Sequence, residues 1–527
     1  MSSLIVIPAV AGAAEVENLK TANFHLGAKM MLLNNFPDLK AFKEFSKQYN
    51  VIPVCTEILA DTETPVSLLR KFYMDQGPVF LFESVEGGER WGRYSFLGTS
   101  ARSSIKIYRE HIEIISNKDI EKVDHGGDPC HVLRKLMAAY VPAEMPGLPR
   151  FWGGLVGYMN YEMVSFFESI PNSWPDDKPI SHFIIPDELL IFDNISNTLC
   201  LVVITFLEDM EGKHVTESDL FDSACGRIDT MLSVMKVKAD TDLDKGMLPR
   251  KTCALSPVIE NEVFRANVSK VKEYIYQGDI IQSVISQPFV CEQPPDLWSL
   301  YRAQRYINPS PYLFFIHLDD VALVGSSPET MVRLEGGVAT LRPIAGTRHR
   351  GKTEQEDRAL ADDLLKDEKE RAEHLMLVDL GRNDLGRIAE IGSVQVTELM
   401  VVERYSHVMH LVSNIISDIR NDVDAWDLIA ATFPAGTLSG APKIRAMEII
   451  EEMEKEPRGP YGGAVGYVSF SGNMDMAITI RTACIENNRL VVRAGAGIVA
   501  DSDPESERIE TVNKAMAIQR AMELVTK

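Results

Sequence analysis

Two pairs of glutamates lie far apart in the chain and share one spacing. Glu370 and Glu373 stand in KERAEHLMLVDLGRNDLGR, and Glu507 and Glu510 stand in PESERIETVNKAMAIQRAMEL. Both segments have helical periodicity, and residues three apart on a helix point the same way. Two such faces brought together would direct up to four carboxylates at one point, where like charges repel unless a cation lies among them. Oxygen ligands of this kind suit Mg²⁺, which usually shares its site with an anionic substrate. The alternative from spacing alone is two solvated helix faces.

Cationic and glycine-rich segments predict receptors for an anion beside this candidate metal site. The segment RPIAGTRHRGK carries four cations around Gly346 and Thr347: Arg342, Arg348, Arg350 and Lys352. FPAGTLSGAPK opens a helix, whose N-terminus favours an anion. Arg481 lies in a predicted strand, AGAGIV exposes a backbone bend, and Lys514 lies one helical turn beyond Glu510. Each feature also has an ordinary structural explanation, and the sequence alone does not show that they converge.

Bulk properties narrow the class of protein. With 527 residues the chain predicts two or more folding units. Its formal net charge of −22 argues against nonspecific binding of nucleic acid. Seven scattered cysteines without C-x-x-C spacing support neither zinc nor a redox motif, and they predict free thiols in a reducing compartment. The start lacks a basic segment, and no run of 18 apolar residues exists, so we expect a cytoplasmic protein that contacts no membrane.

The pattern of elements predicts an α+β fold. We expect a leader over residues 1–50, a β-rich region over 51–235, a linker over 236–258 and a second region over 259–527. The second region alternates β-hairpins with helices, including a long helix over 354–381 and a Gly-Gly hairpin at 336–337. Successive hairpins predict large antiparallel sheets with helices packed outside. GGLVGY at 153–158 resembles GGAVGY at 462–467, which indicates either similar sheet corners or chance.

A series of motifs resembles a known family. GSSPE, RPIAGTRHRG, AEHLMLVDLGRND, RYSHVMH, FPAGTLSGAPK, YGGAVGY, ITIRT, AGAGIV and E-x-x-E-x-x-NK occur in this order from about residue 257 to the C-terminus. Together they resemble the chorismate-binding enzymes. FLFESVEGGERWGRYSFLG and NPSPYLFF resemble the anthranilate synthase large subunits in particular. The resemblance implies two stacked antiparallel β-sheets flanked by helices, with the active site in a cleft.

The same resemblance implies how the substrate is held. Mg²⁺, bound through Glu370, Glu373, Glu507 and Glu510, would grip the ring carboxylate of chorismate. Around that carboxylate we expect Thr437, the backbone of Gly495 and Gly497, and Lys514. Tyr461 and Arg481 would take the enolpyruvyl carboxylate, for which the arginine fork is well suited.

The implied reaction assigns the catalytic residues. Ammonia adds to the ring carbon next to the one that bears the carboxylate, and the ring hydroxyl leaves. Hydroxide is a poor leaving group, so Glu329 of GSSPE is expected to act as a general acid with a raised pKa. Pyruvate is then eliminated, and His410 occupies the position associated with this step; the alternative is a core histidine satisfied by hydrogen bonds. We also expect Thr347 to act as a catalytic residue together with Glu329 and His410.

Two positions distinguish this chain from related enzymes. Isochorismate and salicylate synthases carry a lysine that activates water where this chain has Gln282, and an amide is not a general base. Aminodeoxychorismate synthases commonly carry a nucleophilic lysine where this chain has Ala345. Both differences favour direct attack by ammonia and an anthranilate product.

The resemblance also predicts partners. None of the cysteines lies in a G-x-C-x-G elbow, and Cys225 in SACG comes nearest, so a separate glutamine amidotransferase subunit is expected to supply ammonia in a hetero-oligomer. Two segments resemble the site at which L-tryptophan inhibits the large subunit; the alternative is a strand edge and a proline-rich turn. Their residues are Glu83, Ser84, Asn308, Pro309, Ser310, Tyr312, Leu313 and Phe314.

Three other functions stay open on the sequence. Two are enzymes of the same family, an aminodeoxyisochorismate synthase and an aminodeoxychorismate synthase component I. The third is an inactive regulatory chain that senses tryptophan. The presence of the four glutamates, Glu329 and His410 counts against the third, because a sensor would not need them all.

Overall fold

The computed structural model describes residues 31–84, 92–116, 119–210, 212, 214–237, 254–405 and 408–526. Most of the predicted leader and residues 238–253 of the predicted linker therefore lie outside the described residues. The described end of the leader forms β1 (Leu32–Phe36) and α1 (Leu39–Phe45). β1 pairs with β2 (Val51–Leu59), so it belongs to the sheet that follows.

Two long bent strands divide the sheet into two arms. β4 (Tyr94–Ile107) and β8 (Ser181–Asp193) pair along their whole length, and their register shifts three times between Gly98 and Ser103. Such bulges bend a strand and increase its twist. The first half of β4 pairs with β3 (Val79–Glu83), whereas the last part pairs with β5 (His111–Ser116). β8 likewise pairs at one end with β9 and at the other with β7.

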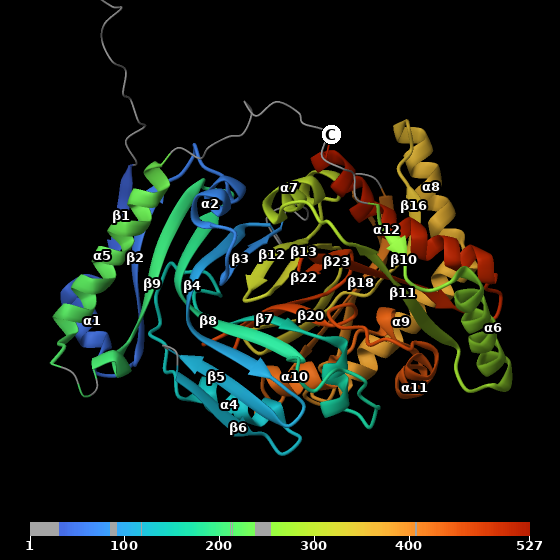
Figure 1. Ribbon diagram of the computed structural model, residues 1–527, viewed down its shortest axis with the longest axis horizontal. Coiled ribbons are helices and arrows are strands. Elements are labelled where there is room, and N and C mark those ends of the chain that lie inside the picture. Colours follow the sequence, from blue (N-terminus) through green and yellow to red (C-terminus); the bar gives the residue numbers. More distant parts are fainter. Residues whose placement is uncertain are drawn as a thin grey trace, which may run out of the picture.

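Each arm is a run of antiparallel neighbours (Figure 1). The first arm continues from β3 through β12 (Tyr312–Leu318), β13 (Val321–Ser327), β22 (Thr482–Glu486), β23 (Arg489–Ile498) and β11 (Gln282–Cys291), which also pairs with β10 (Ser256–Pro257) and β19 (Gly440–Ala441). The second runs through β7 (Gly154–Met159), β20 (Ala464–Ser469), β21 (Met474–Ile478), β14 (Thr330–Glu335), β15 (Val338–Leu341) and β18 (Val408–Asp418), flanked by β16 (Ile344–His349) and β17 (Gln395–Arg404). β9 (Thr198–Phe206) joins β2 to β8, and β6 (Asp119–Asp124) extends β5. The predicted α+β fold with large antiparallel sheets is confirmed, and the two layers are arms of one continuous sheet.

Side-chain alternation places the core on both faces of the first arm. On β12, Phe314 and Ile316 join the core that also holds residues of the second arm, such as Leu155. Leu313 and Phe315 point to the opposite face, because successive side chains of a strand alternate. There they join a second core with residues of α7 (Leu297–Ile307) and α12 (Pro504–Thr526).

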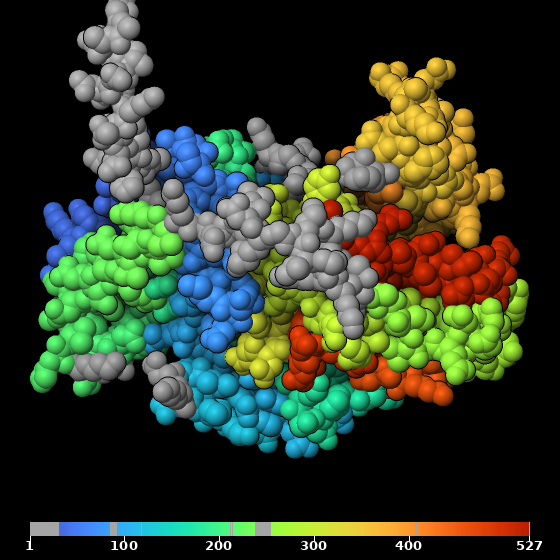
Figure 2. All heavy atoms as spheres, turned by 45° about the horizontal axis from the view of Figure 1, so that its top comes forward, coloured from blue at the N-terminus to red at the C-terminus, as the bar shows by residue number. Residues whose placement is uncertain are grey.

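Helices cover the outer faces of the sheet. The others are α2 (Pro65–Phe72), α4 (Pro129–Ala138), α5 (Glu217–Lys236), α6 (Asn261–Gln277), α8 (Glu354–Lys366), α9 (Glu368–Gly386), α10 (Ala425–Thr432) and α11 (Lys443–Met453), with short 3₁₀ segments η2 (Tyr161–Phe166), η3 (Leu207–Met210) and η5 (Gly436–Leu438). Figure 1 shows α7 and α12 over the first arm and α4 and α10 on the opposite side of the molecule. On the face shown in Figure 2, α6 and α12 lie next to each other, and α8 projects beyond them.

Local signals explain where several elements begin and end. The expected helix over 354–381 is two helices, because Asp367 leaves the helical conformation and caps α9 by accepting the backbone N–H groups of Lys369 and Glu370. The predicted Gly-Gly hairpin is confirmed between β14 and β15, where Gly336 and Gly337 both have positive φ, which a two-residue hairpin turn requires.

The two similar six-residue segments are neighbours in the sheet. β7 and β20 pair so that Gly157 lies opposite Gly466. A Cβ atom on either glycine would lie about 2 Å from a carbonyl oxygen of the next strand, that of His182 or Asp475. The repeated GGxVGY pattern therefore reflects a tight strand seam rather than corners in separate layers.

The prediction for the cysteines is confirmed at five described positions and wrong at one. The prediction of free thiols is confirmed for Cys55, Cys130, Cys200, Cys225 and Cys484, and it is wrong for Cys291, which is disulfide-bonded. Of the helices in the described part of the chain, none combines the length and apolar content needed to cross a bilayer.

Candidate active site

One cleft of about 500 Å³ brings together residues from both arms and from α9 and α12. All fourteen residues predicted for catalysis, substrate binding and metal binding line it: Gln282, Glu329, Thr347, Glu370, Glu373, His410, Thr437, Tyr461, Arg481, Gly495, Gly497, Glu507, Glu510 and Lys514. The first of these residues, Gln282, and the last, Lys514, are more than 230 positions apart in the chain. The fold therefore brings together residues whose proximity the spacing in the sequence did not show.

The two glutamate pairs project from the N-terminal parts of α9 and α12. Burial raises the pKa of Glu373, and the negative charges of Glu370 and Glu510 raise it further. Burial also raises the pKa of Glu507, with a contribution from Glu510. These effects place the carboxylates near enough to repel one another.

Two of these glutamates have cationic partners within the protein. Glu510 pairs with Lys514 at 2.8 Å, and Glu370 pairs with Arg348 at 3.3 Å. No group of three or more metal-binding side chains among the described residues is gathered closely enough to hold an ion. The carboxylates share a cleft, but they do not form a closed set of ligands.

Glycine lets two side chains approach the floor of the cleft. A Cβ atom on Gly495 would lie 2.6 Å from the hydroxyl of Tyr461, and one on Gly497 would lie 2.7 Å from the amide nitrogen of Gln282. Lys514 Nζ donates a 2.9 Å hydrogen bond to the carbonyl of Gly495. Any larger residue at either glycine would displace a side chain assigned to the site.

Glu329 is a buried carboxyl that follows β13. Burial raises its pKa to about 8, although the hydroxyl of Thr437, the amide of Ile344 and the charge of Arg481 act in the opposite direction. Glu329 is therefore protonated at neutral pH and can donate a proton. The Thr437 hydroxyl is buried beside this carboxyl.

His410 faces the cleft from β18. Its Nδ1 lies 2.9 Å from the carbonyl of Gly346 and 3.1 Å from the hydroxyl of Thr347. Burial lowers its pKa, so the ring is neutral at pH 7. A carbonyl can only accept a hydrogen bond, so the contact with Gly346 requires a proton on Nδ1 of His410. We therefore assign the proton of the neutral ring to Nδ1, which leaves Nε2 as a base.

Arg481 is a partly buried cation that lines the cleft. Its backbone has a positive φ of 49°, and its carbonyl accepts a 3.3 Å hydrogen bond from the amide of Ser326. Burial lowers its pKa, and only the ionised form of Glu329 opposes that effect. A partly buried guanidinium of this kind suits a carboxylate ligand.

The segments predicted to bind tryptophan line two small cavities. Glu83, Ser84, Tyr312, Leu313 and Phe314 line a cavity of about 60 Å³ together with residues of β20 and β21. The remaining three residues, Asn308, Pro309 and Ser310, line another of about 50 Å³, which also contacts His410 and Arg481.

Glu83 already has partners within the protein. Its carboxylate accepts hydrogen bonds from Nε of Arg305 at 3.1 Å and from the hydroxyl of Tyr301. Its side chain is only 2% exposed, so a ligand ammonium would have to displace these contacts.

The sequence analysis missed several residues that line the cleft. These are Lys369, Leu377, Ile480 and Arg493. Lys369 and Arg493 stand one and two positions from predicted site residues, so their neighbours in the sequence were the only available signal. Leu377 and Ile480 are apolar and give no chemical signal.

The matched family model is that of the chorismate binding enzymes, and it covers residues 85–520. The chain belongs to this family. The curated anthranilate synthase component 1 of Acetivibrio thermocellus is 44% identical over 495 residues, which cover 93% of this chain and 98% of the relative. The same component from Aquifex aeolicus is 45% identical over 495 residues, which cover 92% of this chain and 97% of the relative.

Solved structures agree with this membership. Anthranilate synthase component I from Streptococcus pneumoniae superposes with a TM-score of 0.72 at 34% identity, over 88% of this chain and 98% of that chain. The menaquinone-specific isochorismate synthase from Escherichia coli has a TM-score of 0.65 at 19% identity, over 92% of this chain and 98% of that chain. The second similarity shows the shared fold.

Proposed function

We propose that this protein is the chorismate-using subunit of an anthranilate synthase, a lyase of tryptophan biosynthesis. The reaction converts chorismate and ammonia to anthranilate, pyruvate and water. The observation that carries the proposal is a buried Glu329, whose pKa burial raises to about 8, in the same cleft as two glutamate pairs and the cations Arg481 and Lys514. Gln282 and Ala345 also line this cleft, and neither offers a base or a nucleophile to a competing reaction.

The cleft residues divide the reaction between them. Arg481 and Tyr461 hold the enolpyruvyl carboxylate, while Lys514, Thr437 and the backbone at Gly495 and Gly497 surround the ring carboxylate. Glu329 gives its proton to the departing hydroxyl, which leaves as water while the nitrogen of ammonia bonds to the ring. His410 is neutral, and its Nε2 accepts a proton in the step that releases pyruvate and makes the ring aromatic. Thr347 supports His410 through its contact with Nδ1.

The glutamate pairs fit a divalent cation in charge and ligand type. Glu370, Glu373, Glu507 and Glu510 would hold Mg²⁺, whose charge would remove the repulsion that raises the pKa of Glu373. Lys514 pairs with Glu510 at 2.8 Å, and a carboxylate can contact an ammonium and a metal ion at the same time. Bound Mg²⁺ would supply electrostatic stabilisation at the ring carboxylate.

One assay separates the proposed function from the alternatives. Purified protein is incubated with chorismate, Mg²⁺ and ammonium, and anthranilate fluorescence and pyruvate are followed together. The proposal requires both products in equal amounts. An aminated ring without pyruvate would indicate an aminodeoxyisochorismate synthase or an aminodeoxychorismate synthase, and no turnover would indicate a regulatory chain.

We expect glutamine to support turnover only when a glutamine amidotransferase subunit is present in a hetero-oligomer. Ammonium salts at alkaline pH, where free ammonia is abundant, should support turnover by this chain alone. The reason is that none of the cysteines stands in a G-x-C-x-G elbow. The measurement compares anthranilate formation from the two nitrogen sources with and without the partner. Glutamine-dependent turnover by the isolated chain would contradict the expectation.

We further propose that L-tryptophan inhibits the enzyme by binding where β3 and β12 pair. Leu313 pairs with Glu83 and Phe314 with Phe82, so the N-terminal region and the catalytic region meet at this cavity. The adjoining cavity of Asn308, Pro309 and Ser310 contacts His410 and Arg481, which gives a short structural connection to the cleft. A ligand acts through such a connection only if it binds the two arrangements with different affinity.

Replacing Ser84 by phenylalanine should weaken inhibition by L-tryptophan at least tenfold while uninhibited turnover stays within about twofold. The added ring would fill the cavity of about 60 Å³ that Ser84 lines. Inhibition constants and calorimetric affinities of both proteins measure the effect. Unmodified protein that neither binds tryptophan nor slows in its presence would remove the regulatory proposal. We also propose that the protein is located in the cytoplasm.

A further inference from the structure

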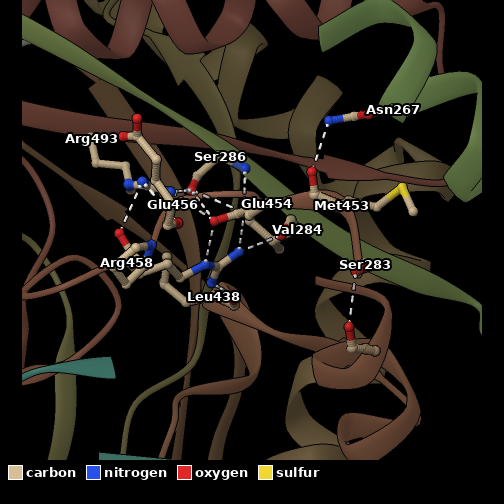
Figure 3. A network of polar contacts seen from close by, with 12 residues as sticks. Asn267, Ser283, Val284, Ser286, Leu438, Met453, Glu454, Glu456, Arg458 and Arg493 are labelled. Carbon is tan, nitrogen blue, oxygen red and sulfur yellow. Dashed lines mark hydrogen bonds and ion pairs between the residues drawn. The ribbon is translucent and has the colours of Figure 1, made fainter. Parts of the chain in front are cut away.

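One buried guanidinium joins several segments that line the cleft (Figure 3). Arg458 Nη1 donates a 2.7 Å hydrogen bond to the carbonyl of Leu438, and Nη2 donates one of 2.7 Å to the carbonyl of Val284. Leu438 and Val284 both line the cleft, beside Thr437 and two positions from Gln282. Arg458 therefore ties the η5 turn to strand β11.

The same guanidinium lies between two tyrosine rings. Its central carbon is 4.6 Å from the ring centre of Tyr161 and 5.7 Å from that of Tyr461. Tyr461 lines the cleft and is assigned to a substrate carboxylate. A cation over a ring face is attracted to it, so Arg458 also supports the position of Tyr461.

Glu454 holds this guanidinium in place. Its carboxylate accepts from Nη2 of Arg458 at 2.7 Å and from Nε at 3.0 Å, a two-point contact that fixes the plane of the guanidinium. It also accepts from the amide of Ser286 at 2.8 Å and from Nη1 of Arg493 at 2.8 Å. Burial alone would raise the pKa of Glu454, but the two arginines outweigh it and hold the pKa below its usual range.

Arg493 extends the network to β23, the strand that carries Gly495 and Gly497. Its Nη1 also donates to the Ser286 hydroxyl at 3.2 Å, and its Nη2 donates to the carbonyl of Pro457 at 3.1 Å. Arg493 lies two positions before Gly495 on β23, and Ser286 is the partner of Gly495 across the β11–β23 pair. The cleft floor and the loop before Tyr461 are thus fastened to one carboxylate.

A residue of the N-terminal region fixes the same loop. One oxygen of Glu162, in η2, accepts hydrogen bonds from the backbone N–H groups of Arg458 at 2.7 Å and Gly459 at 3.1 Å. The side chains of Arg458, Glu454 and Arg493 are 2%, 4% and 6% exposed. Arg493 lines the cleft, whereas Glu454 and Arg458 do not, so these two act on the cleft through the segments that they join.

We propose that Glu454 and Arg458 are positioning residues, which set Tyr461 and the Thr437 turn at the separation that the substrate carboxylates require. The inference deepens the proposed function and rests on it. Lysine at position 458 would keep the charge, but its single ammonium does not reproduce the planar fork that reaches Glu454, Leu438 and Val284 together. The cluster therefore determines substrate binding more than proton transfer, because neither Glu329 nor His410 contacts it.

The test is a double-mutant cycle of Arg458→Lys and Tyr461→Phe. With ammonium as nitrogen source, Arg458→Lys should raise the KM for chorismate by roughly 10- to 100-fold and lower kcat less. In the Tyr461→Phe background the same change should have a much smaller effect, because the two residues act as one unit. Lys71→Met is the matched control, since it also breaks a mostly buried ion pair, the one between Lys71 in α2 and Glu63 just before α2. Neither residue lines the cleft, so this change should leave KM unchanged.

Two further variants keep the inference testable if Arg458→Lys does not fold. Glu454→Gln keeps the shape of the side chain, and Ser286→Ala removes one hydroxyl from the network; each should raise KM several-fold with a cooperative thermal transition retained. Folded variants with unchanged KM, or effects that simply add to that of Tyr461→Phe, would overturn the inference. If the unmodified protein makes no anthranilate, the proposed function fails separately, and chorismate affinities of the same variants by calorimetry still decide the positioning role.

Discussion

Replacing Glu329 by glutamine is expected to lower kcat by roughly 100- to 10,000-fold while the KM for chorismate changes by only a few-fold. The amide keeps the volume of the side chain and its contacts with Thr437 and Ile344, but it has no acidic proton to give to the departing hydroxyl. Steady-state kinetics with saturating ammonium measure both constants. A kcat within threefold of the unmodified value would remove Glu329 from the role of general acid.

The pH dependence of the unmodified enzyme gives an independent check on this residue. Because burial raises the pKa of Glu329 to about 8, the active, protonated form predominates below that pH and is lost as the pH rises through it. Turnover at a fixed concentration of free ammonia should therefore fall above about pH 8, and Glu329→Gln should show no such decline. Free ammonia has to be held constant, since its own increase with pH would mask the loss of the acid.

Glu373→Gln and Glu510→Gln are each expected to abolish turnover, with a loss of at least about 100-fold at low Mg²⁺. Each change removes a formal negative charge and an oxygen ligand from the cleft, and an amide is a poorer ligand for a divalent cation. Activity measured across a range of Mg²⁺ concentrations should recover in part at the highest concentrations.

Glu368→Gln is the matched control for the metal prediction. Glu368 is the first residue of α9, five positions before Glu373, but it is exposed to solvent and does not line the cleft. Its replacement should leave the Mg²⁺ dependence unchanged. Near-normal activity of Glu373→Gln or Glu510→Gln at low Mg²⁺ would exclude that residue from the metal site.

The sequence predicted the cleft better than it predicted the framework around it. Glu-x-x-Glu spacing placed each carboxylate pair on one helix face, and the caps at Asp367 and Asp503 start α9 and α12 where those faces meet the cleft. These are local signals, and the motif resemblance related them to one another. Their roles in the reaction stay predictions until the variants are measured.

The sequence patterns did not predict contacts between residues far apart in the chain, or the burial of charged pairs. Glu454, the C-cap of α11, and Arg458 are four residues apart, which is the spacing of an ordinary surface ion pair, yet both are buried. Glu162 fixes a loop almost 300 positions away, and nothing in its own segment indicates that contact. The helix expected over 354–381 failed for a different reason: its apolar periodicity continues across Asp367, so only the capping contacts reveal the break.

The strand pairs β3–β12 and β7–β20 have a consequence for how this protein can be recombined with its relatives. Each pair joins a strand before residue 238 to one after residue 253. Backbone hydrogen bonds therefore connect the two parts of the chain at two strand seams, β3–β12 and β7–β20. A fragment that begins at residue 259 would leave β12 and β20 with unpaired backbone groups, which favour aggregation. A chimaera that takes its first part from a relative must match the register of both seams at once, and the facing Gly157 and Gly466 make the second seam intolerant of larger residues.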